Sequence, residues 1–167
     1  GYSTYEGTTY NAFLLLGEKN ILIDTVKEKF SDELLSNISR IIDPKDIDVV
    51  ISNHTEMDHS GAIPNVLNAI GKEKPLYCSK MGEKNLKSHF HCDFNFQVVG
   101  SGDQVKIGNR TFAFLETRML HWPDSMFTYL VDDAILFSSD AFGQHYAGDK
   151  FFDDEIGDEI IPHARKY

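Results

Sequence analysis

The sequence predicts an α/β (α+β) fold in which helices pack on a layered β-sheet. Between residues 47 and 99, short apolar runs alternate with stretches of helical periodicity, which is typical of helices packed against a sheet. Between residues 103 and 137 the pattern changes to two hairpins. A length of 167 residues is sufficient for one domain with a substantial core and too short for two. We therefore expect a single domain over residues 1–167.

The N-terminal elements are expected to be a β-hairpin followed by a helix. Residues 10–16 are apolar and aromatic with few charges, as in a buried strand, and the Lys-Asn pair at 19–20 forms the turn into a second strand over residues 21–24. Ser31 is then placed as the N-cap of a helix with apolar residues at helical spacing. This helix should end before Pro44, because proline cannot continue it.

The middle of the chain is expected to alternate strands and helices. Pro64 fits the first turn of a helix and Gly71 its end, because proline is tolerated at a helix start and glycine favours the residue after a helix. The other expected elements here are strands over residues 47–52, 75–78 and 96–99 and a helix over residues 79–91.

Two antiparallel hairpins are expected in the second half of the chain. Residues 103–107 turn at Gly108-Asn109 into a strand over residues 111–115. Residues 127–131 and 134–137 should pair in the same way across two aspartates.

A dense group of metal-binding side chains follows the apolar run that ends at residue 52. His54, Glu56, Asp58 and His59 stand at i, i+2, i+4 and i+5, so that a buried strand ends in a ligand-rich turn. Imidazole suits iron, zinc and copper, whereas carboxylate favours harder ions. The mixture therefore favours iron or manganese over a structural zinc.

Two further candidate ligands, His121 and Asp140, also follow predicted strands. Strand ends on one edge of a layered sheet can bring side chains from distant parts of the sequence together, and we expect these two residues to join the first group there. Taken alone, His121 could instead be a hydrogen-bonded loop histidine, and Asp140 could be the N-cap of a helix that follows it.

Composition excludes several classes of partner. A net charge of -10 and a pI near 5.0 argue against a nucleic-acid or anionic-membrane partner, since both require a basic surface. Cys78 and Cys92 lie apart from the ligand group and form no C-x-x-C, which favours reduced thiols and a cytoplasmic protein. No apolar run is long enough to span a membrane, and no signal-peptide pattern is present. The chain opens on Gly1 without a methionine, as a piece of a longer protein would.

These motifs together resemble the diiron domain of the flavodiiron proteins, which are A-type flavoproteins with a metallo-β-lactamase-like fold. The resemblance is carried by the H-x-E-x-D-H motif at 54–59, by His121 within Leu-His-Trp-Pro-Asp, by Asp140 within Ser-Asp-Ala-Phe-Gly, and by residues 7–11. It implies an αββα sandwich that this chain would leave incomplete at its C-terminal end. It also implies a flavodoxin-like FMN domain, expected downstream and absent from this chain.

The resemblance further implies a ligand set. One iron would be held by His54, Glu56 and His121, and the second by Asp58 and His59, with Asp140 bridging the two. The family places one more histidine on the second iron, well past Asp140, and neither His145 nor His163 stands where it is expected. No catalytic residue beyond the metal ligands and no FMN-binding residue can be identified in the chain.

The implied activity is that of a diiron oxidoreductase that reduces O2 to water, NO to nitrous oxide, or both. The implied cofactors are two iron ions and, in the full-length protein, FMN. The implied partners are an electron donor such as rubredoxin or a similar carrier, and a second copy of the chain in a head-to-tail homodimer.

Two functions of other classes remain open from the sequence. The first is a zinc-dependent hydrolase of the metallo-β-lactamase fold, in which metal-bound water attacks an ester or amide. Glu56 argues against it, because the hydrolases of this fold have histidine at that position. The second is a non-catalytic metal-binding or oligomerisation module.

Overall fold

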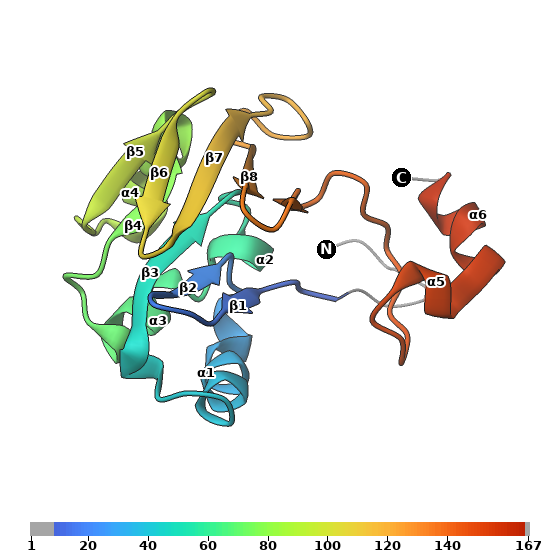
Figure 1. The fold of residues 1–167 in the computed structure, drawn as a ribbon, viewed down its shortest axis with the longest axis horizontal. Coiled ribbons are helices and arrows are strands. Elements are labelled where there is room, and N and C mark those ends of the chain that lie inside the picture. The colour runs from blue at the N-terminus through green and yellow to red at the C-terminus, as the bar shows by residue number, and fades with distance from the viewer. Residues whose placement is uncertain (1–8, 166–167) are drawn as a thin grey trace. The chain divides into compact units, whose positions relative to one another are not determined.

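The computed structural model describes residues 9–165 (Figure 1). Residues 7 and 8 of the segment that carries part of the family resemblance lie outside this range. The described residues divide into two compact units, one comprising residues 10–139 and the other comprising residue 9 together with residues 140–165.

The larger unit contains a five-stranded mixed sheet in the order β1-β2-β3-β4-β5. The first two strands are antiparallel and the other neighbouring pairs are parallel. Parallel neighbours require a crossover connection, and helices provide it here. The strands are β1 (Phe13–Leu15), β2 (Asn20–Ile23), β3 (Ile47–Ser52), β4 (Leu76–Ser79) and β5 (Phe96–Val99). The helices are α1 (Ser31–Ser39), α3 (Ile63–Ile70) and α4 (Lys80–Phe90).

A second sheet of four antiparallel strands follows in the order β6-β7-β8-β9 (Figure 1). Each neighbour in the sheet is also the neighbour in sequence, so both predicted hairpins are confirmed. The strands are β6 (Gln104–Ile107), β7 (Arg110–Glu116), β8 (Met126–Leu130) and β9 (Ile135–Phe137).

Two separate apolar cores hold these layers together. Along β2, Leu22 packs with residues of the helices, whereas Ile21 and Ile23 pack with residues of the second sheet. Val50 and Ile51 of β3 divide in the same way, because successive side chains of a strand point to opposite faces. The central strands are therefore buried on both sides, with helices on one face of the first sheet and the second sheet on the other.

Polar contacts join β2 and β3 at both ends of the pair. At the start, the backbone N–H of Asn20 and the ammonium of Lys19 donate to the Asp48 carboxylate over 3.0 Å and 2.9 Å. At the far end, the backbone N–H of Asn53 donates to Asp24 Oδ1 over 2.7 Å. The aspartate at each end thus ties one strand to the other.

The predictions for this unit are confirmed in most respects. The strands at 47–52 and 96–99 have the expected bounds, and α3 starts at Ile63 and stops before Gly71. Three expectations are wrong in detail. The turn before β2 lies at residues 17–19, and Asn20 is already the first residue of the strand. The first strand covers three residues instead of seven. Ser31 is the first residue of α1 and not its N-cap, because a 3₁₀ helix (Glu28–Phe30) leads directly into α1 and the Ser31 hydroxyl donates to the Glu28 carbonyl.

Short helices occupy the described end of the second unit. They are α5 (Asp153–Ile156), a 3₁₀ helix (Gly157–Glu159) and α6 (Ile160–Ala164). The first turn of α5 is acidic, and Gly157 at φ +71° separates α5 from the helical residues that follow it. Within residues 9–165 no helix is both long and apolar enough to cross a membrane.

The two cysteines are free and lie in contrasting environments. Cys78 on β4 is buried and Cys92 is exposed. Burial raises the pKa of the Cys78 thiol to about 12. Because the thiolate is the nucleophile, we expect an alkylating reagent at pH 8 to modify Cys92 alone in the folded protein and both cysteines in denaturant, as measured by mass spectrometry. Equal labelling rates in the folded protein would contradict the described packing of β4.

Candidate metal centre

The first part of the site follows β3 directly. Asn53, His54 and Thr55 are almost completely buried, and the chain then enters the short helix α2 (Met57–Ser60). The backbone N–H groups of His59 and Ser60 both donate to the Glu56 carbonyl over 2.9 Å. Asp58 and His59 therefore lie on a helical turn, within the ligand-rich segment that the sequence predicted after β3.

Two of the predicted ligands, His54 and His121, lie close to a third, Glu56. Its Oε2 lies 3.5 Å from His54 Nε2 and 3.3 Å from His121 Nε2. Each of the three side chains offers one ligand atom, and these atoms lie within 4.8 Å of one another. His54 is 1% exposed, whereas the side chains of Glu56 and His121 are 39% and 48% exposed. His121 therefore lies within the group and not apart from it, and its role as a ligand stays a prediction.

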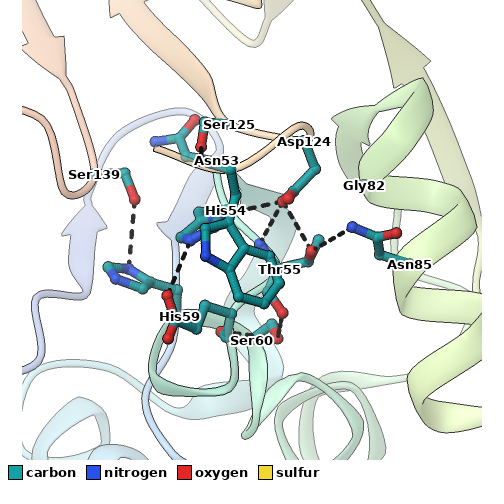
Figure 2. A network of polar contacts seen from close by, with 12 residues as sticks. Asn53, His54, Thr55, His59, Ser60, Gly82, Asn85, Asp124, Ser125 and Ser139 are labelled. Atoms are coloured by element: carbon teal, nitrogen blue, oxygen red, sulfur yellow. Dashed lines mark hydrogen bonds and ion pairs between the residues drawn. The ribbon is translucent and has the colours of Figure 1, made fainter. Parts of the chain in front are cut away.

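His59 and Asp58 lie beside this group. The His59 ring centroid is 5.4 Å from that of His54, and its Nδ1 lies 3.5 Å from Ser139 Oγ (Figure 2). Asp58 has a buried Oδ1 with no hydrogen-bond partner within the described part of the chain. A buried carboxylate oxygen without a partner is costly, and a bound cation would satisfy it. The donor set therefore fits a metal ion.

Negative charge near the site also acts on Lys27. Its hydrogen bond to Tyr10 raises the pKa of the Lys27 ammonium, against the opposing effect of burial. The carboxylates of Asp58 and Glu56 raise the pKa of Lys27 further. These carboxylates thus create an electrostatic environment that favours cations.

Asp140 is joined directly to Ser139, at the point where the second unit begins. Its alternative interpretation as a helix N-cap is wrong. The residues after it form a turn in which the Gly143 N–H donates to the Asp140 carbonyl over 3.0 Å, and α5 begins only at Asp153. Its role as a ligand stays a prediction.

Asp124 is a residue of the site whose role the sequence did not predict. Its side chain is completely buried, and its Oδ2 accepts hydrogen bonds from the Thr55 backbone N–H (2.7 Å) and hydroxyl (2.8 Å) and lies 3.1 Å from His54 Nδ1 (Figure 2). Burial alone would raise the pKa of Asp124, but the bonds from His54 and Thr55 lower it below its ordinary value. The only signal in the sequence is its position three residues after His121 in the same motif.

The second sheet fixes the exit of β3 from the other side. The Met126 N–H donates to the Asn53 carbonyl over 2.9 Å, and the Thr128 hydroxyl donates to Asn53 Oδ1 over 2.6 Å. The Trp122 ring packs edge-on against His54 with centroids 5.4 Å apart. The site therefore lies where β3 of the first sheet meets the start of β8.

A β-sandwich with helices on one sheet and a histidine and carboxylate cluster at its strand ends defines a metal-binding domain of the beta-lactamase-like class. Residues 8–167 match the family described as ODP family beta lactamase. The chain belongs to this family, and the predicted metallo-β-lactamase-like fold class is confirmed.

Individual relatives agree with this assignment. The chain is 46% identical over 169 residues to the anaerobic nitric oxide reductase flavorubredoxin of Salmonella arizonae, covering 99% of this chain and 35% of that protein. It is 44% identical to the nitric oxide reductase of Moorella thermoacetica, and the match covers 99% of this chain and 42% of that protein.

The solved structures give the same result. The rubredoxin oxygen:oxidoreductase of Desulfovibrio gigas superposes with a TM-score of 0.92 at 43% identity, covering 97% of this chain and 41% of that one. The flavodiiron protein of Giardia intestinalis superposes with a TM-score of 0.89 at 36% identity, and the match covers 99% of this chain and 40% of that one. The predicted similarity to flavodiiron proteins is confirmed, and the chain spans about two fifths of the length of these relatives.

Proposed function

We propose that this chain is the diiron part of an oxidoreductase that reduces O2 to water, NO to nitrous oxide, or both. The observation that carries the proposal is the convergence of His54 and His121 on one oxygen of Glu56. The names of the relatives support it, since two are nitric oxide reductases and one is an oxygen oxidoreductase.

The residues of the site suit iron in two oxidation states. His54, Glu56 and His121 would hold one iron, and Asp58 and His59 would hold the second, with Asp140 bridging. A diiron centre would supply a binding place for a diatomic gas and two electrons. Glu56, Asp58 and Asp140 would offset much of the metal charge, so that neither oxidation state leaves a large net charge in the site.

The side chains of this chain cannot supply the electrons needed beyond those two, so a separate electron donor has to deliver them to the site. We propose that FMN of the whole protein delivers them, with rubredoxin or a similar carrier as the donor. A head-to-tail homodimer would bring the FMN of the partner subunit to the metals, and a cytoplasmic location fits the free cysteines.

A zinc hydrolase of the same fold is the less favoured alternative. Glu56 adds a negative charge to the ligand group, which suits redox iron better than a zinc-bound hydroxide. The names of the relatives also point to reduction of O2 or NO and not to hydrolysis.

Metal analysis tests the proposal. We expect protein expressed with ample iron and purified without oxygen to contain iron in clear excess over zinc and manganese. With a chemical reductant it should consume O2 or NO at a rate that falls when the iron is removed by a chelator. Zinc in place of iron under these conditions, together with esterase activity, would contradict the proposal and favour the hydrolase.

A further inference from the structure

The buried carboxylate of Asp124 contacts three potential donors through a single oxygen. Oδ2 lies 2.7 Å from the Thr55 backbone nitrogen, 2.8 Å from its hydroxyl oxygen and 3.1 Å from His54 Nδ1. Oδ1 has no hydrogen-bond partner within residues 9–165. The contacts are therefore concentrated on the segment that leaves β3.

This arrangement determines which nitrogen of His54 faces the ligand group. An ionised carboxylate only accepts hydrogen bonds, and carboxylates face both ring nitrogens: Asp124 Oδ2 lies 3.1 Å from Nδ1 and Glu56 Oε2 lies 3.5 Å from Nε2. The Asp124 contact is the shorter one and its carboxylate is completely buried, whereas the Glu56 side chain is 39% exposed, so the geometry favours the proton of a neutral His54 ring on Nδ1. Nε2 is then the nitrogen that carries the lone pair, and it is Nε2 that lies 3.5 Å from Glu56 Oε2. The ring is thus fixed in the form and direction that a metal ligand requires.

Further hydrogen bonds extend from this carboxylate to α4 (Figure 2). The Asn85 side-chain amide donates to Thr55 Oγ1 over 3.1 Å, and the hydroxyl of Thr55 donates in turn to Asp124. The Ser79 hydroxyl, which caps α4 by accepting from the Gly82 N–H, donates to the Asp124 carbonyl over 2.9 Å. Both the side chain and the backbone of Asp124 are therefore anchored to the same helix.

We propose that Asp124 is a positioning residue for His54: through Thr55 and Asn85 it connects α4 to the imidazole, and it fixes the Nδ1–H tautomer so that Nε2 faces the metal. The proposal rests on the metal-binding part of the proposed function, and it does not depend on which metal or which gas is used. Carboxylates that orient a metal-binding histidine typically change metal affinity by about 10- to 100-fold when they are replaced.

The experiment compares Asp124→Asn with Thr55→Val and a control, Asp133→Asn. The Asp124→Asn substitution keeps the shape of the native side chain and removes its charge, whereas Thr55→Val removes the hydroxyl and keeps the backbone N–H. Asp133 is a half-exposed aspartate on the same unit, 3.9 Å from Arg110 and outside the site. Two quantities are measured: the His54 tautomer by ¹⁵N NMR of the metal-free protein at pH 8, and the affinity for Co²⁺ by visible absorption.

In the native protein and the Asp133→Asn control we expect the Nδ1–H tautomer of His54 and equal Co²⁺ affinity. In Asp124→Asn we expect the Nε2–H tautomer to become populated and Co²⁺ to bind about 10- to 100-fold more weakly. In Thr55→Val we expect a smaller loss, about threefold to tenfold, because Asp124 loses the hydroxyl of Thr55 and keeps its contacts with the Thr55 backbone N–H and with His54. Thermal unfolding of each metal-free protein shows whether the fold is retained.

A native Nε2–H tautomer, or Co²⁺ affinity of Asp124→Asn within about twofold of native, would overturn the proposal. If Asp124→Asn does not fold, the Thr55→Val protein becomes the test. An unchanged His54 ¹⁵N resonance together with unchanged Co²⁺ affinity in Thr55→Val would then overturn the proposal. If the native protein prefers zinc to iron, the proposed function fails while the tautomer and Co²⁺ results still test Asp124.

Discussion

Replacing Glu56 with glutamine is expected to leave the fold intact and to weaken iron binding by about a hundredfold or more, beyond the range seen for residues that only orient a ligand. Glu56 Oε2 lies 3.5 Å from His54 Nε2 and 3.3 Å from His121 Nε2. A neutral amide oxygen is a poorer ligand for iron than a carboxylate, and it leaves more of the metal charge uncompensated. The measurement is iron per chain after dialysis against a weak chelator.

A matched control is Glu33→Gln, which changes an exposed glutamate of α1 in the same way. It should bind as much iron as the native protein. Glu56→His should instead raise the ratio of zinc to iron, because it removes the negative charge and adds an imidazole. If Glu56→Gln retains native iron content, Glu56 is not a ligand and the assignment of the first metal position is incorrect.

Replacing Phe112 with alanine is expected to lower the free energy of unfolding by about 3–5 kcal/mol. Phe112 lies in the middle of β7, is completely buried, and belongs to the core between the two sheets. Its loss removes apolar contacts and leaves a cavity that the neighbouring strands can only partly fill. Urea denaturation of the metal-free protein, followed by circular dichroism, measures the change.

Leu115→Ala provides the control on the same strand. Leu115 points away from the core and is 52% exposed, so its truncation should change the free energy of unfolding by less than about 1 kcal/mol. Equal effects of the two substitutions would mean that the two sheets are not closely packed at β7.

The sequence was informative about the fold where apolar spacing and chain-breaking residues agree. The strand at 47–52 has three consecutive apolar residues at 49–51, and α3 has Pro64 at its start and Gly71 at its end, so both were predicted closely. Ser31 was misassigned because a serine before an apolar helix resembles an N-cap, whereas the 3₁₀ helix that precedes it depends on local hydrogen bonds.

The site was predictable only in its candidate ligands. Histidine and carboxylate spacing identified the group at 54–59, and its position after a predicted strand made His121 a further candidate. The structure brings Glu56 and His121 together. The role of Asp124 could not be predicted, because its partners His54 and Thr55 lie 70 and 69 residues away in sequence. A contact of that kind exists only once the two sheets are packed.

The two aspartates at the ends of β2 and β3 have a consequence for the precision of the site. Strands with apolar residues on both faces do not specify their own register, since a shift by one residue exchanges one apolar face for another. The bonds of Asp48 to Asn20 and of Asp24 to Asn53 are specific to one alignment. A slip of one position would carry His54 along the strand by about 3.3 Å, which is as far as the separation between neighbouring ligand atoms. The two carboxylates at the ends of the strand pair thus determine how the ligands line up with one another. Asp48 contributes to this alignment from the end of β3 that is opposite to His54.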